Sequence, residues 1–453
     1  MIKLTRFAFV LLTSTTAAIF CTLLLSSDFL TTYRRSSASR KEQVFTREEK
    51  QENRGSTTKS VSTIKLPNAQ FETTAVLNAN LLERGFTDKQ IESISPLGKW
   101  LLAPEGSSPP QSNATNKTYL ILIWKHGQFL ERRHIRHFTS IKFSPWDQCS
   151  VQNCLLSYNE KDLHRADAVL FHLHLTRNLS ELPARSQANQ RWIFLTDESP
   201  LHTFVHGPQR LSNYDGLFNW SMSYRMDSDV PVPYGRTIRT FKNFPAKHWD
   251  TTVRTSKTKL VAIMGSNCGG RNGRWSYVKA LKSLLHGDLD IIGKCLGGNK
   301  TVCPGHFDKD CVALESYKFY LSFENSNCRE YLTEKIFWNA YRKFAVPIIM
   351  GASRQDCLLL LPPHSYLHVD DFADANALAD YIRYLDRDDE RYFGYHEWRN
   401  HYRVINEHGY FGSVSRHYCR ICEALHYNSV VPKVYTNLEH FWSKERDCVP
   451  ASA

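Results

Sequence analysis

The chain has 453 residues, of which 42% are hydrophobic and 23% are charged. This composition excludes a polytopic membrane protein and a wholly disordered chain, and the length suits two globular domains with accessory segments. The formal net charge of +12 is compatible with nucleotides, phosphates, an anionic membrane surface or a merely basic exterior, and it selects none of these. Because no block of Lys and Arg marks a nucleic-acid face, we expect no nucleic-acid partner.

An uncharged apolar segment occupies residues 7–27. About 20 apolar residues in a helix are long enough to cross the hydrocarbon core of a bilayer. The segment lacks the small-residue cleavage site of a secretory signal peptide. We therefore expect an uncleaved signal anchor at 7–27 and a cytosolic tail at 1–6, although the flanking positive charges alone do not set the orientation.

Cysteines and glycosylation sequons indicate the compartment. Of the 12 cysteines, Cys21 lies in the apolar segment and the other 11 follow it. Five Asn-X-Ser/Thr sequons occur, at Asn113, Asn116, Asn178, Asn219 and Asn299. Behind a signal anchor, these features together favour an oxidising lumen. Because 11 is an odd number, we expect at least one cysteine to be free or bonded to another chain.

Two pairs of cysteines lie close together in the sequence, Cys149 with Cys154 and Cys419 with Cys422. The alternative for Cys419-Arg-Ile-Cys422 is half of a zinc site, but the sequence has no second C-x-x-C and no histidine pair at zinc spacing. We interpret all four cysteines as candidates for disulfides and leave their pairing open.

Residues 28–116 are rich in Ser, Thr, Lys, Arg, Glu and Gln, which indicates a lumenal stem, with one short helix expected around 87–94. Apolar runs then predict buried parallel strands at 119–124, 166–175 and 191–195. These strands predict a first Rossmann-like domain at 117–235.

A second alternation of strands and helices follows a linker predicted at 236–256. Strands are expected at 259–264, 289–292 and 345–350, and helices at 271–285, 333–344 and 375–385. They predict a second Rossmann-like domain at 257–440 and a C-terminal tail at 441–453. Ligands of open α/β sheets bind at the carboxyl ends of the strands, so two facing sheets predict a site in a cleft.

The most informative stretch is 317–336, where a strand leads into the polar turn Glu324-Asn325-Ser326 and then into a helix capped by Thr333. A helix N-terminus presents unpaired N–H groups and the positive end of the helix dipole. Lys335 at this position indicates a diphosphate pocket, with Glu334 able to accept hydrogen bonds from sugar hydroxyls. An ordinary capped surface helix is the alternative.

A glycine-rich turn, Ser266–Arg274, joins a predicted strand to a predicted helix. Such turns let the backbone approach phosphate oxygens, and Arg271 and Arg274 are the charged candidates because an arginine can hold two phosphate oxygens. The turn matches neither G-x-G-x-x-G nor a P-loop. A flexible turn with solvated arginines is equally compatible with this pattern.

Thr196-Asp-Glu-Ser-Pro200 follows a predicted strand of the first block. A carboxylate at the carboxyl end of a strand can act as a general base. The alternative is that Asp197 and Glu198 cap a helix.

Two further patterns resemble metal sites. Asp227-Ser-Asp229 has the D-x-D form of many nucleotide-sugar enzymes, but three-residue matches are common. His172 and His174 alternate on a predicted strand and are interpreted as buried, hydrogen-bonded histidines. We expect no metal ligand at either place.

Three segments closely resemble signatures of the α1,3-fucosyltransferase family: 317–351, 218–235 and 192–200, the last ending in Glu-Ser-Pro. The likeness extends from about Tyr119 to Cys422. It implies an α/β fold of GT-B type with two Rossmann-like domains facing across a cleft, and a single-pass type II anchor in the Golgi membrane with a lumenal catalytic region. It also implies GDP-fucose as donor and inversion at the fucose anomeric carbon, with no cofactor or metal required and divalent cations as non-essential stimulators at most.

The resemblance also implies roles for individual residues. Glu198 takes the position of the base that removes the proton from the acceptor hydroxyl. Arg274 and Lys335 would neutralise the departing diphosphate. The remaining candidates for donor binding are Asn325, Tyr331, Glu334 and Arg271. Asp227-Ser-Asp229 becomes part of a family segment.

The sequence departs from the family pattern in two places: Glu330 stands where Asp is usual, and Arg342-Lys-Phe344 replaces a small-Gly turn. Residues 266–274 and 419–422 resemble the core-type members, which fucosylate O3 of the asparagine-linked GlcNAc of N-glycans. The expected partners are therefore an N-glycan or glycoprotein acceptor, GDP-fucose and the Golgi membrane. The alternatives are a Lewis-type enzyme acting on terminal lactosamine and a non-catalytic Golgi glycan-binding homologue.

Overall fold

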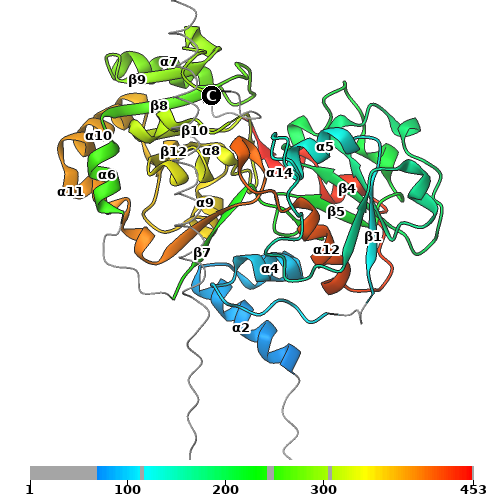
Figure 1. Ribbon diagram of the computed structural model, residues 1–453. Helices are drawn as coiled ribbons and strands as arrows, with labels where there is room; N and C mark the ends of the chain where they lie inside the picture. Colours follow the sequence, from blue (N-terminus) through cyan, green and yellow to red (C-terminus); the bar gives the residue numbers. More distant parts are fainter. Residues whose placement is uncertain (1–68, 113–116, 242–248, 305–308, 451–453) are drawn as a thin grey trace, which may run out of the picture. The chain divides into compact units, whose positions relative to one another are not determined.

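The computed structural model of the protein describes residues 69–112, 117–241, 249–304 and 309–450 (Figure 1). The predicted cytosolic tail, the predicted signal anchor and the sequons Asn113 and Asn116 lie outside these residues. Within the described part of the chain, no helix combines the length and the apolar character that crossing a bilayer requires.

The first sheet has six parallel strands in the order β2-β1-β3-β4-β5-β6. They are β1 (Tyr119–Ile123), β2 (Cys154–Ser157), β3 (Ala168–His172), β4 (Arg191–Thr196), β5 (Trp220–Ser223) and β6 (Val230–Pro231). The three strands predicted in this block are β1, β3 and β4. Alternate residues serve opposite faces, because Leu122 and Val169 pack in one core cluster while Ile121 and Leu170 pack in another. Burial on both faces explains why these strands are continuous apolar runs.

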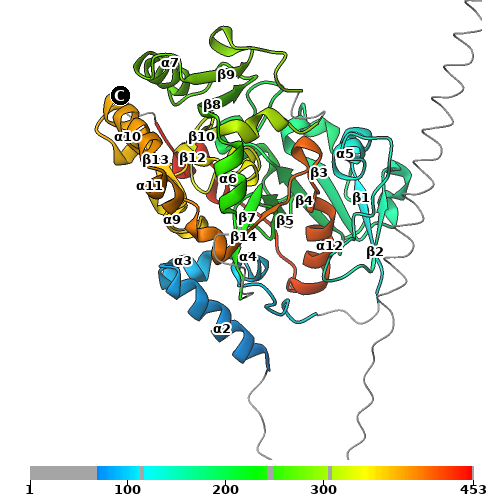
Figure 2. The same cartoon turned by 60° about the vertical axis from the view of Figure 1, so that its left-hand side comes forward.

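Helix α5 (Gly127–His134) follows β1, and α12 (His417–Tyr427) packs on the same sheet although it comes from the far end of the chain (Figure 2). Every residue of α12 is buried. Two disulfides, Cys149–Cys419 and Cys154–Cys422, attach it to the region around β2. The predicted second domain at 257–440 therefore differs from the structure, since the chain returns to the first sheet before residue 417.

The second sheet has five parallel strands in the order β13-β12-β10-β8-β9. They are β8 (Lys259–Gly265), β9 (Leu289–Gly293), β10 (Tyr317–Phe323), β12 (Val346–Met350) and β13 (Leu367–His368). The helices of this half are α6 (Asp250–Ser256), α7 (Arg274–Leu284), α8 (Glu334–Phe337), α9 (Arg354–Leu360), α10 (Ala375–Arg387) and α11 (Asp389–Gly394). The two predicted strand–helix blocks are thus confirmed as two parallel α/β sheets.

The helix expected at 333–344 is only the four-residue α8. A short 3-10 turn follows at Tyr341–Lys343 and ends at Phe344, whose φ of 55° lies in the left-handed region. A helix cannot continue through such a residue. Phe344 therefore makes the turn at which a small-Gly sequence was expected, and β12 begins two residues later at Val346.

The predicted linker at 236–256 contains ordered structure. Strand β7 (Gly235–Arg239) pairs antiparallel with β14 (Tyr402–Asn406), and α6 ends the segment. Hydrogen bonding to a strand more than 160 residues later in the chain was not visible from the irregular local pattern.

Part of the predicted stem is folded. Helices α2 (Ala69–Glu83), α3 (Asp88–Ser93) and α4 (Pro96–Leu102) form a small core with Met226 and Leu359 from the two halves of the chain. Helix α3 confirms the short helix expected around 87–94 and is capped by Thr87. The stem prediction therefore fails for these residues. Helices α3 and α4, of six and seven residues, are too short to show a clear apolar period, and the apolar residues of the 15-residue α2 do not gather on one face.

The described part of the predicted C-terminal tail, residues 441–450, is also part of the fold. Helices α13 (Leu438–Phe441) and α14 (Lys444–Asp447) lead to β15 (Cys448–Val449), which pairs antiparallel with β11 (Asn327–Cys328). Trp442 is completely buried. We call residues 438–449 the C-terminal strap, because the disulfide Cys328–Cys448 fastens its end to the second half of the chain.

Candidate functional site

A cavity of about 350 Å³ lies where the carboxyl ends of β4, β8 and β10 meet. Six residues singled out from the sequence line it: Glu198, Arg274, Asn325, Tyr331, Glu334 and Lys335. Glu198 follows β4 of the first sheet, whereas the other five follow β8 or β10 of the second. The carboxyl-end rule for open α/β sheets therefore located the cavity. Arg271 does not line this cavity but a neighbouring groove.

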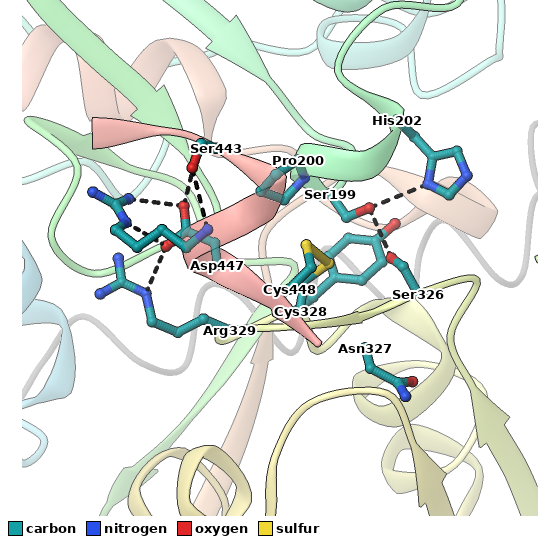
Figure 3. Close-up of a disulfide and its surroundings, with 12 residues drawn as sticks. Ser199, Pro200, His202, Ser326, Asn327, Cys328, Arg329, Ser443, Asp447 and Cys448 are labelled. Carbon is teal, nitrogen blue, oxygen red and sulfur yellow. Dashed lines mark hydrogen bonds and ion pairs between the residues drawn. A yellow bond between two sulfur atoms is a disulfide. The ribbon is translucent and has the colours of Figure 1, made fainter. Parts of the chain in front are cut away.

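The side chain of Glu198 is held from the second half of the chain. Its Oε2 accepts hydrogen bonds from the Tyr331 hydroxyl at 3.0 Å and from Asn325 Nδ2 at 3.3 Å. Its other oxygen, Oε1, has no hydrogen-bond partner among the described residues. Next along the chain, Ser326 Oγ donates to Ser199 Oγ at 2.7 Å (Figure 3). Glu198 thus presents one fixed carboxylate oxygen and one open oxygen to the cavity.

The helix N-terminus predicted to bind diphosphate contains a buried ion pair. Thr333 caps α8, and Lys335 Nζ lies 2.8 Å from Glu324 Oε2. Glu324 is completely buried, and its Oε1 accepts hydrogen bonds from the Thr333 N–H and hydroxyl. Burial would lower the pKa of Lys335, but the charges of Glu324 and Glu334 outweigh it and raise the pKa. Lys335 is therefore a permanent cation at the cavity wall.

Sequence reasoning placed Glu324 in a polar turn without giving it a role. Burial raises its pKa, and the Lys335 ammonium opposes that shift. The Glu324 carboxylate positions both Thr333, which caps α8, and Lys335, and it thereby fixes the wall of the cavity that these residues form. The sequence signal that could have indicated this role is the position of a glutamate directly after a buried strand.

Arg274 begins α7 and binds back to the glycine-rich turn. Its guanidinium donates to the carbonyl oxygens of Asn267, Gly269 and Phe323 at 2.8–3.1 Å. Three of its five N–H donors are used in this way, which leaves two for a ligand. Gly270 has a φ of 139°, which only glycine adopts readily, and the turn is further held by the disulfide Cys268–Cys295.

One alternative was that Asp197 caps a helix, but the structure shows that it does not. Its carboxylate accepts a hydrogen bond from Arg133 Nη1 at 2.7 Å and lies 3.2 Å from His417 Nε2, and its carbonyl accepts from the Tyr234 hydroxyl at 2.7 Å. Burial would raise the pKa of Asp197, but Arg133 and the neighbouring histidines hold it well below its usual value. Asp197 therefore anchors the peptide that carries Glu198.

The carboxylates of the D-x-D pattern pair with basic side chains of the protein. Asp227 is paired with Arg225 and Arg329, and Asp229 with Lys433. A group of possible ligand atoms from Asp197, His408 and His417 lies within 4.8 Å, but Arg133 already pairs with this carboxylate. We therefore describe the group as an ion-pair cluster.

The expectation that His172 and His174 alternate on one strand is wrong, because β3 ends at His172 and the half-buried His174 lies in the 3-10 turn Leu173–Leu175. His172 is buried, and burial lowers its pKa to about 3. Its Nδ1 has no hydrogen-bond partner among the described residues. His174 Nδ1 lies 2.9 Å from the carbonyl oxygen of His202, within hydrogen-bond distance.

The four candidate cysteines form disulfides, and they pair across the chain rather than within each close pair. The described residues contain five disulfides: Cys149–Cys419, Cys154–Cys422, Cys268–Cys295, Cys303–Cys311 and Cys328–Cys448. Cys357 is free and buried, so the odd count is explained by a thiol in the core.

Three sequons fall within the described residues. Asn178 and Asn299 are exposed, and each side-chain oxygen accepts a hydrogen bond from the N–H two residues later. Asn219 is half-buried, and its Nδ2 donates to the Lys433 carbonyl at 2.7 Å. Because Asn178 and Asn299 are exposed and Asn219 is not, the first two are the better placed acceptors.

The two departures from the family pattern lie in ordered backbone. Glu330 adopts a φ of 56°, and its carboxylate accepts a hydrogen bond from the Met226 N–H at 2.8 Å. Burial, reinforced by the Asp227 charge, raises the pKa of Glu330 to about 7. Phe344 makes the second turn, as described above. Neither residue lines the cavity.

Two family models match the chain. One is described as "Fucosyltransferase, N-terminal" and covers residues 116–235; the other is described as "Glycosyltransferase family 10 (fucosyltransferase) C-term" and covers residues 254–442. The matched regions include all six strands of the first sheet and all five of the second.

Three relatives show how far the similarity extends. Glycoprotein 3-alpha-L-fucosyltransferase A of Drosophila melanogaster is 35% identical over 308 residues, which are 67% of this chain and 57% of that protein. Alpha-(1,3)-fucosyltransferase 7 of Rattus norvegicus is 34% identical over 353 residues, 76% of this chain and 84% of that protein. The 4-galactosyl-N-acetylglucosaminide 3-alpha-L-fucosyltransferase FUT6 of Homo sapiens is 37% identical over 308 residues, 65% of this chain and 77% of that protein. The chain thus spans little more than half of the Drosophila relative and most of the two mammalian ones.

Proposed function

We propose that this chain, which belongs to glycosyltransferase family 10, the fucosyltransferases, transfers L-fucose from GDP-fucose to O3 of a GlcNAc residue. One observation carries the proposal. A carboxylate from the first sheet, Glu198, shares a cavity of about 350 Å³ with two cations from the second half of the chain, Arg274 and Lys335. Inverting transfer needs a base on one side of the sugar and cations around the leaving diphosphate on the other.

The geometry around Glu198 suits a general base. Asn325 and Tyr331 hold Oε2, so Oε1 can accept the proton of the acceptor hydroxyl. The deprotonating O3 attacks the anomeric carbon from the face opposite the diphosphate. The bond from carbon to the diphosphate oxygen then breaks with its electron pair, and the configuration inverts.

The cations act on the leaving group. Lys335 is fixed by Glu324 beside the N-terminus of α8, and Arg274 retains two N–H donors beyond its bonds to the glycine-rich turn. Charge develops on the diphosphate oxygen as the bond to fucose breaks, and cations held in position stabilise that charge without reorganising. Glu334, Asn325 and Tyr331 are the proposed contacts to the sugar and nucleotide.

For the acceptor, we propose the asparagine-linked GlcNAc of N-glycans. The support is the resemblance of residues 266–274 and 419–422 to core-type enzymes, together with similarity to a Drosophila protein named for glycoprotein acceptors. The second candidate is the GlcNAc of terminal lactosamine, which the name of the human relative describes.

For location and architecture, we propose a single-pass type II protein of the Golgi membrane with a GT-B arrangement of its two sheets. The uncharged segment at 7–27 and the five disulfides among the described residues support a lumenal catalytic region. Protease protection of the full chain in sealed microsomes tests the orientation, since digestion of everything except a short amino-terminal piece would contradict it.

The function is tested with the full chain purified in detergent. It is incubated with GDP-fucose and either an N-glycopeptide or a lactosamine, and mass spectrometry locates the added deoxyhexose. Fucose on O3 of the asparagine-linked GlcNAc supports the core assignment, and fucose on the lactosamine GlcNAc supports the alternative. Binding of GDP-fucose without transfer to either acceptor would indicate a non-catalytic glycan-binding homologue. Repeating the assay in EDTA and with added Mg²⁺ measures the expected metal independence and any stimulation.

A further inference from the structure

A second hollow adjoins the cavity. It has a volume of about 780 Å³, and its walls come from opposite ends of the chain: residues 200–212, which follow the Glu198 loop, and residues 439–445 of the C-terminal strap. Arg271 closes the end next to the cavity, and its backbone N–H donates to the Asn325 carbonyl at 3.0 Å. We call this hollow the strap groove. Pro200 in its wall is only two residues from Glu198.

Buried contacts connect the two walls of the strap groove. The buried indole of Trp442 donates to Thr203 Oγ1 at 3.0 Å, which links the strap to the opposite wall. Asp447 pairs with the buried guanidinium of Arg225 at 2.8 Å. Figure 3 shows Asp447 and the Cys328–Cys448 disulfide beside Ser199 and Pro200. The groove is therefore a fixed part of the fold next to the catalytic loop.

The side chains along the groove are those that recognise hydroxyl groups. Five exposed charged residues of both signs line it: Arg210, Arg271, Glu439, Lys444 and Glu445. His202 is half-buried, and burial lowers its pKa, with the charge of Glu198 opposing the shift and that of Arg271 adding to it. A neutral imidazole offers one donor and one acceptor. Since each sugar hydroxyl both donates and accepts, donors and acceptors side by side match a neutral saccharide.

The position of the groove sets what can reach it. The nucleotide sugar occupies the cavity between Glu198 and the cations in the proposed function, so the acceptor must approach Glu198 from outside that cavity. The strap groove begins at the residues that follow Glu198 and leads away from it. Phe204 lies in the wall, half-buried and stacked on Tyr214 with ring centroids 5.8 Å apart, and gives the apolar C–H face of a sugar ring a surface to contact.

We propose that the strap groove binds the neutral oligosaccharide that extends from the fucosylated GlcNAc. The proposal rests on the proposed function and adds the site that distinguishes long acceptors from short ones. Glu198 and the cavity perform the transfer, whereas Arg210, Lys444 and their neighbours contact sugar residues further along the acceptor.

The test uses the full chain with the double substitution Arg210→Glu and Lys444→Glu. Two acceptors are compared: a peptide with one GlcNAc on asparagine and the same peptide with a complete N-glycan. We expect the KM for the complete glycan to rise about tenfold, because hydrogen bonds from charged donors to hydroxyls are lost. The KM for the short acceptor, the KM for GDP-fucose and kcat should each change by less than about twofold.

The matched control is Lys279→Glu with Lys282→Glu, two exposed lysines on α7 that do not line the groove. This control reverses the same amount of charge, so an equal rise in KM there would show a general electrostatic effect and overturn the proposal. An unchanged KM for the complete glycan in the groove variant, or an equal rise for both acceptors, would also overturn it. The failure of the unsubstituted chain to transfer fucose to either acceptor would instead overturn the proposed function, and with it the premise of the groove proposal.

Discussion

The two sides of the cavity are built in different ways. On the side proposed to bind the diphosphate, which we call the phosphate side, Glu324, Thr333 and Lys335 hold one another within 12 consecutive residues that run from the end of β10 into α8. On the side of Glu198, the proposed base, Asp197 is held by Arg133, 64 residues before it, and by His417, 220 residues after it; we call this the base side. The comparison teaches that the phosphate side is a local motif, whereas the base side depends on the complete tertiary fold.

The largest effect is expected on the base side itself. Glu198→Gln should lower kcat by at least about 100-fold, because general-base catalysis contributes roughly 10²–10⁴-fold. The amide can still accept from Tyr331, so GDP binding measured by calorimetry should stay close to that of the unsubstituted chain. Turnover within a few-fold of the original would remove Glu198 from the base role.

The next effect is expected on the phosphate side. Lys335→Ala should weaken GDP-fucose binding by about 10- to 100-fold, since hydrogen bonds from a charged donor are worth roughly 1.5–3 kcal/mol. Calorimetric titration measures the loss, and thermal unfolding confirms that the variant is folded.

Arg274→Ala and Arg271→Ala form a matched pair for the same side. Arg274 lines the cavity and Arg271 lines the strap groove. Arg274→Ala should therefore lower donor affinity much more than Arg271→Ala does. Equal losses of GDP-fucose affinity in the two variants would indicate that Arg271 also binds the donor.

The non-local support of the base is expected to appear as stability. Asp197→Asn leaves the buried guanidinium of Arg133 without its counter-charge, which costs about 3–5 kcal/mol for a buried pair. Urea unfolding measures the change. Asp371→Asn, at an exposed carboxylate paired with the exposed Arg354, is the control and should cost clearly less. Equal costs in the two variants would show that the base side has no special dependence on Asp197.

The smallest expected effect is a change in the free energy of unfolding at acidic pH. Burial would raise the pKa of Glu407, but Arg420 and Arg236 outweigh it and lower the pKa to about 2. A carboxylate with a depressed pKa stabilises the fold above its unfolded pKa of about 4.5 and loses that contribution as the pH falls toward 2. The difference in unfolding free energy between the original chain and Glu407→Gln should therefore shrink over that range. A difference that does not change with pH would contradict it.

The parts of the fold that could be predicted from the sequence are those that depend on neighbouring residues. Apolar runs located β1, β3, β4, β8, β9 and β12, and the segment at 324–335 located one wall of the cavity. The roles of Asp197, Arg133 and His417 depend on contacts across the whole chain, which periodicity does not encode. The same reason explains why the strap from residue 441 onward was interpreted as a tail: its burial depends on Thr203 and Cys328, far away in the sequence.

The return of α12 to the first sheet has a consequence for biosynthesis. The disulfide of Cys154 can form only after Cys422, 268 residues later in the chain, has been synthesised. At roughly 5–20 residues per second, a ribosome needs on the order of tens of seconds to supply that partner. During this time the first sheet lacks a helix that covers one of its faces. The nascent chain therefore exposes apolar strand residues and unpaired thiols until its synthesis is almost finished.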